Sequence, residues 1–332
     1  SSEKAFVIVY KSKPNNFYST KNTTQSDASE NLSTQQLQNT AEKLMAPYNG
    51  QIAETFSNAV QGFTAKVPNQ NINQFLKETQ NNPAVESVVE DIPISMNSHS
   101  IQTPVNWGLD RIDQTSLPLN NIYQYQQDGT GVNAYVMDTG IRASHSEFTK
   151  RVLPGFTAIA DGKGTQDCMG HGSHVAGIIG GSTYGVAKNI RITPVRVLDC
   201  RGGGSLSSLL AGLDWIVKNG KLPAVINMSI GTSASDVLDQ AVNNAVKAGF
   251  VVLTSAGNNA GDSCTQSPAR SHDVINVGSS DNTDTKSYYS NYGQCVDLFA
   301  PGSAIRSAWF NSDFESQELS GTSMSAPYVA GV

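Results

Sequence analysis

Ser323 is the residue whose surroundings most strongly suggest chemistry. It follows Gly321-Thr322, and the small and apolar residues after it predict a buried helix. At the start of a helix, free backbone N–H groups and the positive end of the helix dipole stabilise negative charge. A serine in this place can also be no more than a helix cap, which is the simpler interpretation for a residue that stands alone. A nucleophilic serine needs a base and a group that orients the base, and the upstream sequence contains candidates for both.

Asp138 and His171 are those candidates. Asp138 ends the apolar segment Asn133–Asp138 directly before a Thr-Gly pair, where an aspartate alone could simply cap a turn. His171 is followed one helical turn later by His174, and such a pair could bind a metal, but no Glu lies between them and no third ligand is near. We therefore expect His171 to be the accessible histidine and His174 to be a core histidine with satisfied hydrogen bonds.

Beyond residue 100, apolar and amphipathic segments alternate. The apolar segments of strand length are Asn133–Asp138, Ile192–Leu198, Ala224–Ile230 and Val251–Gly257. The helical patterns are His171–Gly181, Ser205–Asn219 and Ser235–Ala248. This alternation predicts an α/β fold, with a mostly parallel sheet and helices on both faces. Reactive residues of such folds lie at the carboxyl ends of strands, which is where Asp138 stands.

Residues 1–99 predict a separate and smaller α+β unit. The expected strands are Lys4–Lys11, Gln51–Ser57, Gly62–Val67 and Val85–Asp91, and the expected helices are Gln35–Tyr48 and Asn71–Thr79. The order β-α-β-β-α-β is the ferredoxin-like arrangement, which does not indicate a function by itself. The polar segment Ser12–Ser33 predicts a loop, and Ile92–Val105 predicts a linker.

Composition excludes two classes of protein. Only 15% of the 332 residues are charged, the net charge is −6 and no basic cluster occurs, so we expect no nucleic-acid binding. The longest apolar runs have strand length, so we expect no membrane span. The chain begins at Ser1 without a signal peptide, which we interpret as a trimmed product.

Four cysteines, Cys168, Cys200, Cys264 and Cys295, all lie beyond residue 100. Three pairings are possible. No C-x-x-C step occurs, which argues against a metal site. Two disulfides in an oxidising compartment are favoured, with buried free thiols as the alternative.

The order Asp, His, Ser distinguishes the candidates from other serine hydrolases. From Ile101 to Val332 the sequence resembles the subtilase family, and within it the proteinase K and aqualysin-like branch. Seven segments carry the resemblance: WGLDRIDQ at Trp107–Gln114, DTGI at Asp138, HGSHVAG at His171, VINMSIG at Val225, SAGNNA at Ser255, SNYGQCVDLFAPG at Ser290 and GTSMSAP at Gly321.

The resemblance implies a role for each matched residue. Ser323 would be the nucleophile, His171 the general base and acid, and Asp138 the group that orients the imidazole. Asn258 would stabilise the oxyanion together with the backbone N–H of Ser323, although a turn residue in the left-handed region is the alternative for Asn258.

Two further segments resemble the substrate channel of the family. Gly202, Gly203 and Gly204 would pair with an extended peptide from one side, and Ser229, Ile230 and Gly231 from the other. A flexible turn is the alternative for the glycines. Recognition mainly through the main chain implies broad specificity.

The resemblance also implies disulfides Cys168–Cys200 and Cys264–Cys295, and structural Ca²⁺ bound by carbonyls of His272 and Val274 with the carboxylate of Asp297. A second calcium site in some relatives corresponds to Asp110, Asp113, Gln114, Asn120 and Ile122. Because the isoleucine side chain cannot bind a metal, we do not expect this second site, and we expect its acidic residues to serve local turns and ion pairs.

The resulting hypothesis is a secreted, monomeric serine endopeptidase precursor acting on peptides and proteins. Residues 1–99 resemble the family's inhibitory propeptide, which assists folding and which the enzyme would cleave between about Met96 and Ile101. Residues 100–332 would be the peptidase domain, apparently truncated because only nine residues follow Ser323. We expect the helix after Ser323 to expose apolar surface and the chain to be poorly stable alone. An inactive or esterase-like homologue is the alternative.

Overall fold

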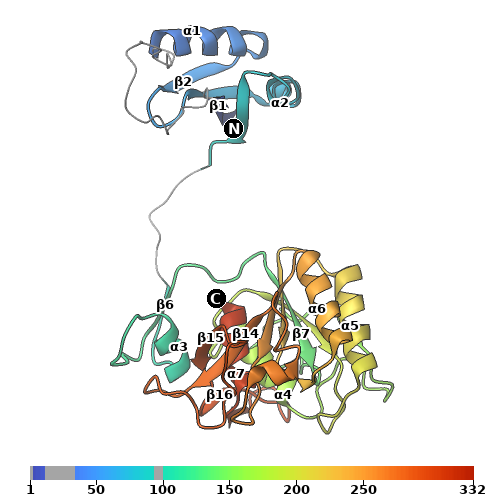
Figure 1. Ribbon diagram of the computed structural model, residues 1–332. Helices are drawn as coiled ribbons and strands as arrows, with labels where there is room; N and C mark the ends of the chain where they lie inside the picture. The colour runs from blue at the N-terminus through green and yellow to red at the C-terminus, as the bar shows by residue number, and fades with distance from the viewer. Residues whose placement is uncertain (1–2, 12–33, 93–99) are drawn as a thin grey trace, which may run out of the picture. The chain divides into compact units, whose positions relative to one another are not determined.

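The computed structural model describes residues 3–11, 34–92 and 100–332. The chain divides into two compact units, Ser1–Met96 and Asn97–Val332, and each is described by itself (Figure 1). The loop predicted at Ser12–Ser33 and residues 93–99 of the predicted linker and cleavage region lie outside the described residues.

The first unit is a four-stranded antiparallel sheet with two helices. Its elements are β1 (Glu3–Tyr10), α1 (Thr34–Met45), β2 (Gln51–Phe56), β3 (Gly62–Pro68), α2 (Ile72–Gln80) and β4 (Val85–Glu90), in the sheet order β2-β3-β1-β4. This is the predicted β-α-β-β-α-β order. Side chains alternate across β1: Phe6 and Ile8 pack with the helices, whereas Val7 lies on the opposite face, across from Val89, which is 53% exposed.

The second unit contains the predicted α/β fold, a seven-stranded parallel sheet. Its strands, in spatial order, are β15 (Leu298–Pro301), β14 (Ile275–Ser280), β12 (Val251–Ser255), β10 (Ala224–Met228), β7 (Asn133–Asp138), β9 (Arg191–Arg196) and β8 (Phe156–Thr157). Its helices are α3 (Trp107–Ile112), α4 (His171–Gly180), α5 (Leu206–Asn219), α6 (Asp236–Lys247) and α7 (Thr322–Gly331). Two-stranded ribbons pair β5 (Ser100–Gln102) with β6 (Tyr123–Tyr125), β11 (Thr232–Ser233) with β13 (Gln266–Ser267), and β16 (Ile305–Ala308) with β17 (Ser316–Leu319).

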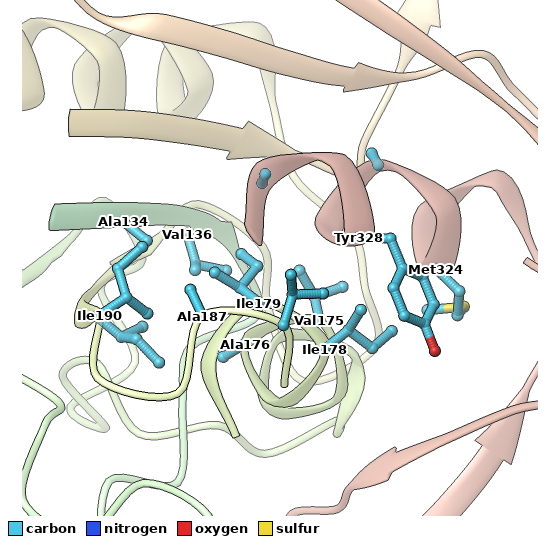
Figure 2. Close-up of a cluster of buried hydrophobic side chains, with 14 of the residues drawn as sticks. Ala134, Val136, Val175, Ala176, Ile178, Ile179, Ala187, Ile190, Met324 and Tyr328 are labelled. Atoms are coloured by element: carbon cyan, nitrogen blue, oxygen red, sulfur yellow. The ribbon is translucent and has the colours of Figure 1, made fainter. Parts of the chain in front are cut away.

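Two hydrophobic cores cover the two faces of this sheet. In β7, Ala134 and Val136 belong to a first core with α4 and α7, whereas Tyr135 and Met137 belong to a second core with α5 and α6. Figure 2 shows the first core, in which α4 side chains lie between β7 and Met324 and Tyr328 of α7. Because β7 is buried on both faces, the residues between Asn133 and Asp138 form a continuous apolar run.

The last helix, α7, is better covered than the sequence suggested. It packs against α4, β12 and β14, and its buried residues include Met324, Ala326 and Tyr328. The expectation of exposed apolar surface holds only at its end, where Val332 is 89% exposed. Among the described residues, no helix combines the length and the apolar character needed to cross a membrane.

Candidate active site

Asp138 and His171 form a hydrogen-bonded pair at the carboxyl end of the inner strand β7. Asp138 is the fully buried last residue of β7, and His171 is the first residue of α4. His171 Nδ1 lies 2.8 Å from Oδ1 and 2.8 Å from Oδ2 of Asp138. Only a protonated Nδ1 can donate to a carboxylate, so this contact leaves Nε2 as the basic nitrogen.

Opposing effects determine the pKa of His171. Burial lowers it, but the charge of Asp138, the hydrogen bond to Asp138 and the charge of Asp167 together outweigh burial and raise the pKa above its usual value. The site therefore stabilises an imidazolium, the form that a general base takes once it has accepted a proton.

Ser323 is the second residue of α7, and its side chain is partly exposed. Its Oγ donates to the carbonyl of Ser229 at 3.1 Å, and Ser229 Oγ donates to the carbonyl of Ser323 at 2.9 Å. No hydrogen bond joins Ser323 to His171 within residues 100–332. The Ser323 hydroxyl is engaged with the carbonyl of Ser229 instead, and catalytic hydrogen bonds often tighten only when substrate is present.

Two hydrogen bonds to Thr322 hold Asn258 so that its amide nitrogen lies near Gly321. Its Oδ1 accepts from the backbone N–H of Thr322 at 2.8 Å and from the Thr322 hydroxyl at 2.9 Å, which identifies Oδ1 and leaves Nδ2 to donate elsewhere. A Cβ placed on Gly321 would lie 3.5 Å from Asn258 Nδ2 and 3.7 Å from the backbone N of Ser323. Both donors therefore border one small space beside Gly321.

The alternative for Asn258, a turn residue in the left-handed region, is wrong. Asn258 is not among the described residues with positive φ. Its neighbours provide the turn instead: Gly257 has φ 102° and Ala260 has φ 51°.

The two candidate substrate segments border one hollow of about 220 Å³. Gly202, Gly204, Ile230 and Gly231 line it, together with apolar side chains such as Leu209. Gly203 does not line it, because its N–H donates to Asp199 Oδ1 at 2.9 Å and its carbonyl accepts from the Asp199 N–H. A turn therefore engages Gly203 and leaves its two neighbours beside the hollow.

The four cysteines form the disulfides Cys168–Cys200 and Cys264–Cys295, so the free-thiol alternative and the other pairings are wrong. The first disulfide joins the loop before His171 to the turn before Gly202. The buried guanidinium of Arg196 lies against its sulfur atoms and pairs with Asp161, which holds the pKa of that carboxyl well below its usual range.

The candidate calcium ligands lie close in sequence to the second disulfide: His272 and Val274 stand between its cysteines, and Asp297 follows Cys295 by two residues. Asp297 is exposed, and its Oδ2 accepts from the backbone N–H of Asn276 at 2.8 Å, two residues after Val274. This hydrogen bond holds a carboxylate beside the His272–Val274 segment and leaves Oδ1 without a hydrogen bond among the described residues. A fixed carboxylate next to a turn of backbone carbonyls fits a hard cation.

Residues of the second candidate calcium set form the hydrogen bonds of local turns. Asp110 accepts from the backbone N–H groups of Asn120 and Asn121, and the side-chain oxygen of Asn120 accepts from Ile122 N–H. The expectation of local turns is thus confirmed for Asp110. Burial raises the pKa of Asp113, whose Oδ1 is buried without a partner.

His174 is the expected core histidine, but its hydrogen bonds are only partly satisfied, because its buried Nδ1 has no partner among the described residues. It is fully buried, and its Nε2 lies 3.1 Å from the carbonyl of Ile305 and 3.0 Å from that of Gln317. Burial lowers its pKa to about 4, so it stays neutral near pH 7.

Sequence reasoning missed Asp167 and Thr139. Asp167 is 3% exposed and accepts hydrogen bonds from the loop and helix that carry His171, and Thr139 connects it to that helix. The available signal was an acidic residue shortly before a helix start, which is common in surface caps and therefore weak.

Comparison with known proteins agrees with this geometry. The sequence profile of the Subtilase family matches residues 129–332. The chain belongs to the subtilase family.

Several known subtilases are similar over most of this chain. An extracellular serine proteinase from Thermus sp. (strain Rt41A) is 48% identical over 297 residues, which make up 90% of this chain and 71% of the relative. Alkaline serine exoprotease A from Vibrio alginolyticus is 44% identical over 300 residues, 89% of this chain and 55% of the relative. A crystal structure of a cold adapted subtilisin-like serine proteinase is 48% identical, with a TM-score of 0.67 over 69% of this chain and 83% of that chain.

Proposed function

We propose that this subtilase is a secreted serine endopeptidase of broad specificity, with Asp138, His171 and Ser323 as its catalytic triad. The observation that carries the proposal is the contact of His171 Nδ1 with both oxygens of a fully buried Asp138. It prepares Nε2 as a base at the carboxyl end of the inner strand β7. Enzyme class follows from family membership, and secretion is supported by the two disulfides and the extracellular Thermus relative.

In the proposed reaction, His171 Nε2 accepts the proton of Ser323 Oγ as that oxygen attacks the peptide carbonyl. Asp138 stabilises the imidazolium through Nδ1. The carbonyl oxygen becomes an oxyanion and enters the space beside Gly321, where Asn258 Nδ2 and the backbone N–H of Ser323 donate to it. The imidazolium then protonates the leaving amine, and water hydrolyses the acyl-enzyme by the same steps.

Broad specificity is supported by the makeup of the hollow between the two segments. Gly202, Gly204 and Gly231 present backbone rather than side chains, so a peptide would be held through main-chain hydrogen bonds. The remaining lining is mostly apolar, with Ser205 and Thr232 as its polar side chains and no charged residue, which favours an apolar peptide side chain without specifying one.

We further propose that residues 1–99 are a propeptide that inhibits the enzyme and is removed by it. The support is the ferredoxin-like topology and the sheet face opposite the helices, where Val7 and the exposed Val89 lie side by side. Such a face suits a partner surface.

Structural Ca²⁺ at His272, Val274 and Asp297 completes the proposal. The ion would link the turn before β14 to Asp297, two residues beyond Cys295, and it would stabilise the native state by mass action. None of the proposed catalytic residues belongs to this set, so its effect would be on stability.

An esterase using the same triad is the second candidate, since acyl transfer to water is common to both. The glycine-lined hollow favours peptides, because main-chain pairing has no counterpart in a simple ester. An inactive homologue is disfavoured by the complete set of nucleophile, base and oxyanion donors, and a burst of acyl-enzyme with an acylating reagent would separate it.

The variant Ser323→Ala tests the triad. We expect it to fold like wild type, to hydrolyse neither peptide nor ester substrates, and to remain uncleaved between residues 1–99 and the peptidase domain. Peptide hydrolysis above about a thousandth of the wild-type rate would refute the assignment. Processing of the purified variant at the wild-type rate would refute self-cleavage.

A further inference from the structure

Asp167 is a buried carboxylate for which the proposed mechanism has no use. It is 3% exposed, and it accepts five hydrogen bonds. The donors are Thr139 Oγ1 at 2.9 Å, Met169 N at 3.0 Å, Gly170 N at 2.8 Å, Ser173 N at 2.9 Å and Ser173 Oγ at 2.7 Å. No Lys, Arg or His forms an ion pair with it in the part of the chain that the structure describes. A charge buried without a cation is costly unless dipoles satisfy it, and here five donors do so.

These hydrogen bonds surround His171 in the sequence. Met169 and Gly170 precede it and donate directly, and Ser173 follows it and donates twice. The remaining neighbour, Gly172, donates its N–H to Thr139 Oγ1 at 2.9 Å, and that hydroxyl donates to Asp167. The backbone on both sides of His171 is therefore attached to one carboxylate.

Thr139 also connects the two buried carboxylates. Its backbone N–H donates to Asp138 Oδ1 at 2.7 Å, while its hydroxyl donates to Asp167 Oδ1. The position of the His171 backbone relative to Asp138 is thus set by residues that Asp167 holds. A shift of about 1 Å in a catalytic group can cost on the order of a hundredfold in rate.

We propose that Asp167 is a positioning residue, which fixes His171 against Asp138 and adds a second negative charge to the site where the imidazolium forms. This inference rests on the proposed triad. The titratable groups that act on His171 are Asp138 at the end of β7, Asp167 in the loop before α4, and His174 one turn along α4. His174 is neutral near pH 7, so the two carboxylates are the charges that favour the imidazolium.

A purely structural role would be that of a cap for α4, whose own N-cap Gly170 has no side chain to offer. A neutral Asn at position 167 could supply much of such a cap, and its loss would lower stability without changing the acidity of His171. The pH dependence of catalysis therefore separates the two roles.

The test is the pH profile of kcat/KM for a peptide substrate, measured on the active enzyme with Asp167→Asn, Thr139→Val and Ser323→Ala in parallel. For Asp167→Asn we expect kcat to fall by about tenfold or more with little change in KM. We expect its acid limb to move to lower pH by about half a unit, because the imidazolium has lost one of two charges. An acid limb at the wild-type position would overturn the proposal.

Thr139→Val keeps the charge and removes the hydroxyl that links Asp167 to Gly172. We expect a lower kcat and an unmoved acid limb, and an unchanged kcat would overturn the positioning role even if Asp167→Asn fails to fold. Failure of the proposed function looks different, since Ser323→Ala would then remain active. Failure of this inference alone leaves wild type active, Ser323→Ala inactive and both other variants like wild type.

Discussion

Gly321 offers a direct probe of the proposed oxyanion site. Its φ of 162° is extended backbone that alanine also adopts, and an added Cβ would meet its three nearest atoms at 3.5 to 3.8 Å, which is ordinary van der Waals distance. We therefore expect Gly321→Ala to fold with an unchanged melting temperature.

The new methyl group would nevertheless occupy the space that the reaction requires. An oxyanion must come to about 2.7–3.1 Å from its donors, and the Cβ would stand 3.5 Å from Asn258 Nδ2 and 3.7 Å from Ser323 N. The two cannot share that space, so at least one donor is lost. Loss of one such donor costs roughly 10² to 10³ in turnover, or about 3–4 kcal/mol, a magnitude measured on a related protease.

The assay is kcat on a chromogenic peptide substrate, with active-site titration to count competent enzyme. Gly261→Ala is the matched control, because a Cβ there has no neighbour closer than 3.9 Å and Gly261 has no part in the proposed chemistry. We expect wild-type turnover for the control. A Gly321→Ala enzyme within about threefold of wild type would refute the placement of the oxyanion beside Gly321.

Two further predictions concern stability. Folding lowers the pKa of His174 from 6.5 to about 4, so the stabilisation that neutral His174 contributes should be fully present above pH 6.5 and should be lost as the pH falls to 4. The free energy of unfolding should fall by about 3 kcal/mol over this range for that reason. Urea unfolding of wild type and His174→Gln at pH 7 and pH 4.5 checks this, and an equal loss of stability in both proteins would contradict it. Chelation should lower the melting temperature of wild type but not of Asp297→Ala, measured by calorimetry; a variant that still responds to chelator would place the metal elsewhere.

The elements of the fold that sequence predicted are those with a clear hydrophobic pattern. β7 matches its prediction because all six of its residues are buried, and the four residues between Asn133 and Asp138 form an apolar run. By contrast, no pattern indicated β14 and β15, whose sequences contain Gly, Ser and Pro and become strands through pairing at one side of the sheet. The predicted strand at Val251–Gly257 ends at Ser255, since the chain must turn to bring Asn258 to Ser323.

The site was predicted unevenly for similar reasons. Asp138, His171 and Ser323 stand in segments that resemble a family, and the structure brings the first two together. Gly203 looked equivalent to Gly202 and Gly204, because sequence does not show which of three glycines a turn will use. Asp167 was missed because its importance comes from five donors that only the folded loop assembles.

The central sheet separates the proposed catalytic residues from most of the proposed substrate hollow, because the helices that carry them pack on opposite faces. The helices that carry His171 and Ser323 pack in the first core (Figure 2), whereas α5 and Ile230, which border the proposed substrate hollow, pack in the second. A substitution that loosens the second core can reach the proposed catalytic residues by three routes: the strands between the cores, the Cys168–Cys200 disulfide, and the hydrogen bonds between Ser229 and Ser323. Substitutions on the α5 side that leave these connections intact should therefore alter the proposed substrate hollow without moving Asp138, His171 or Ser323.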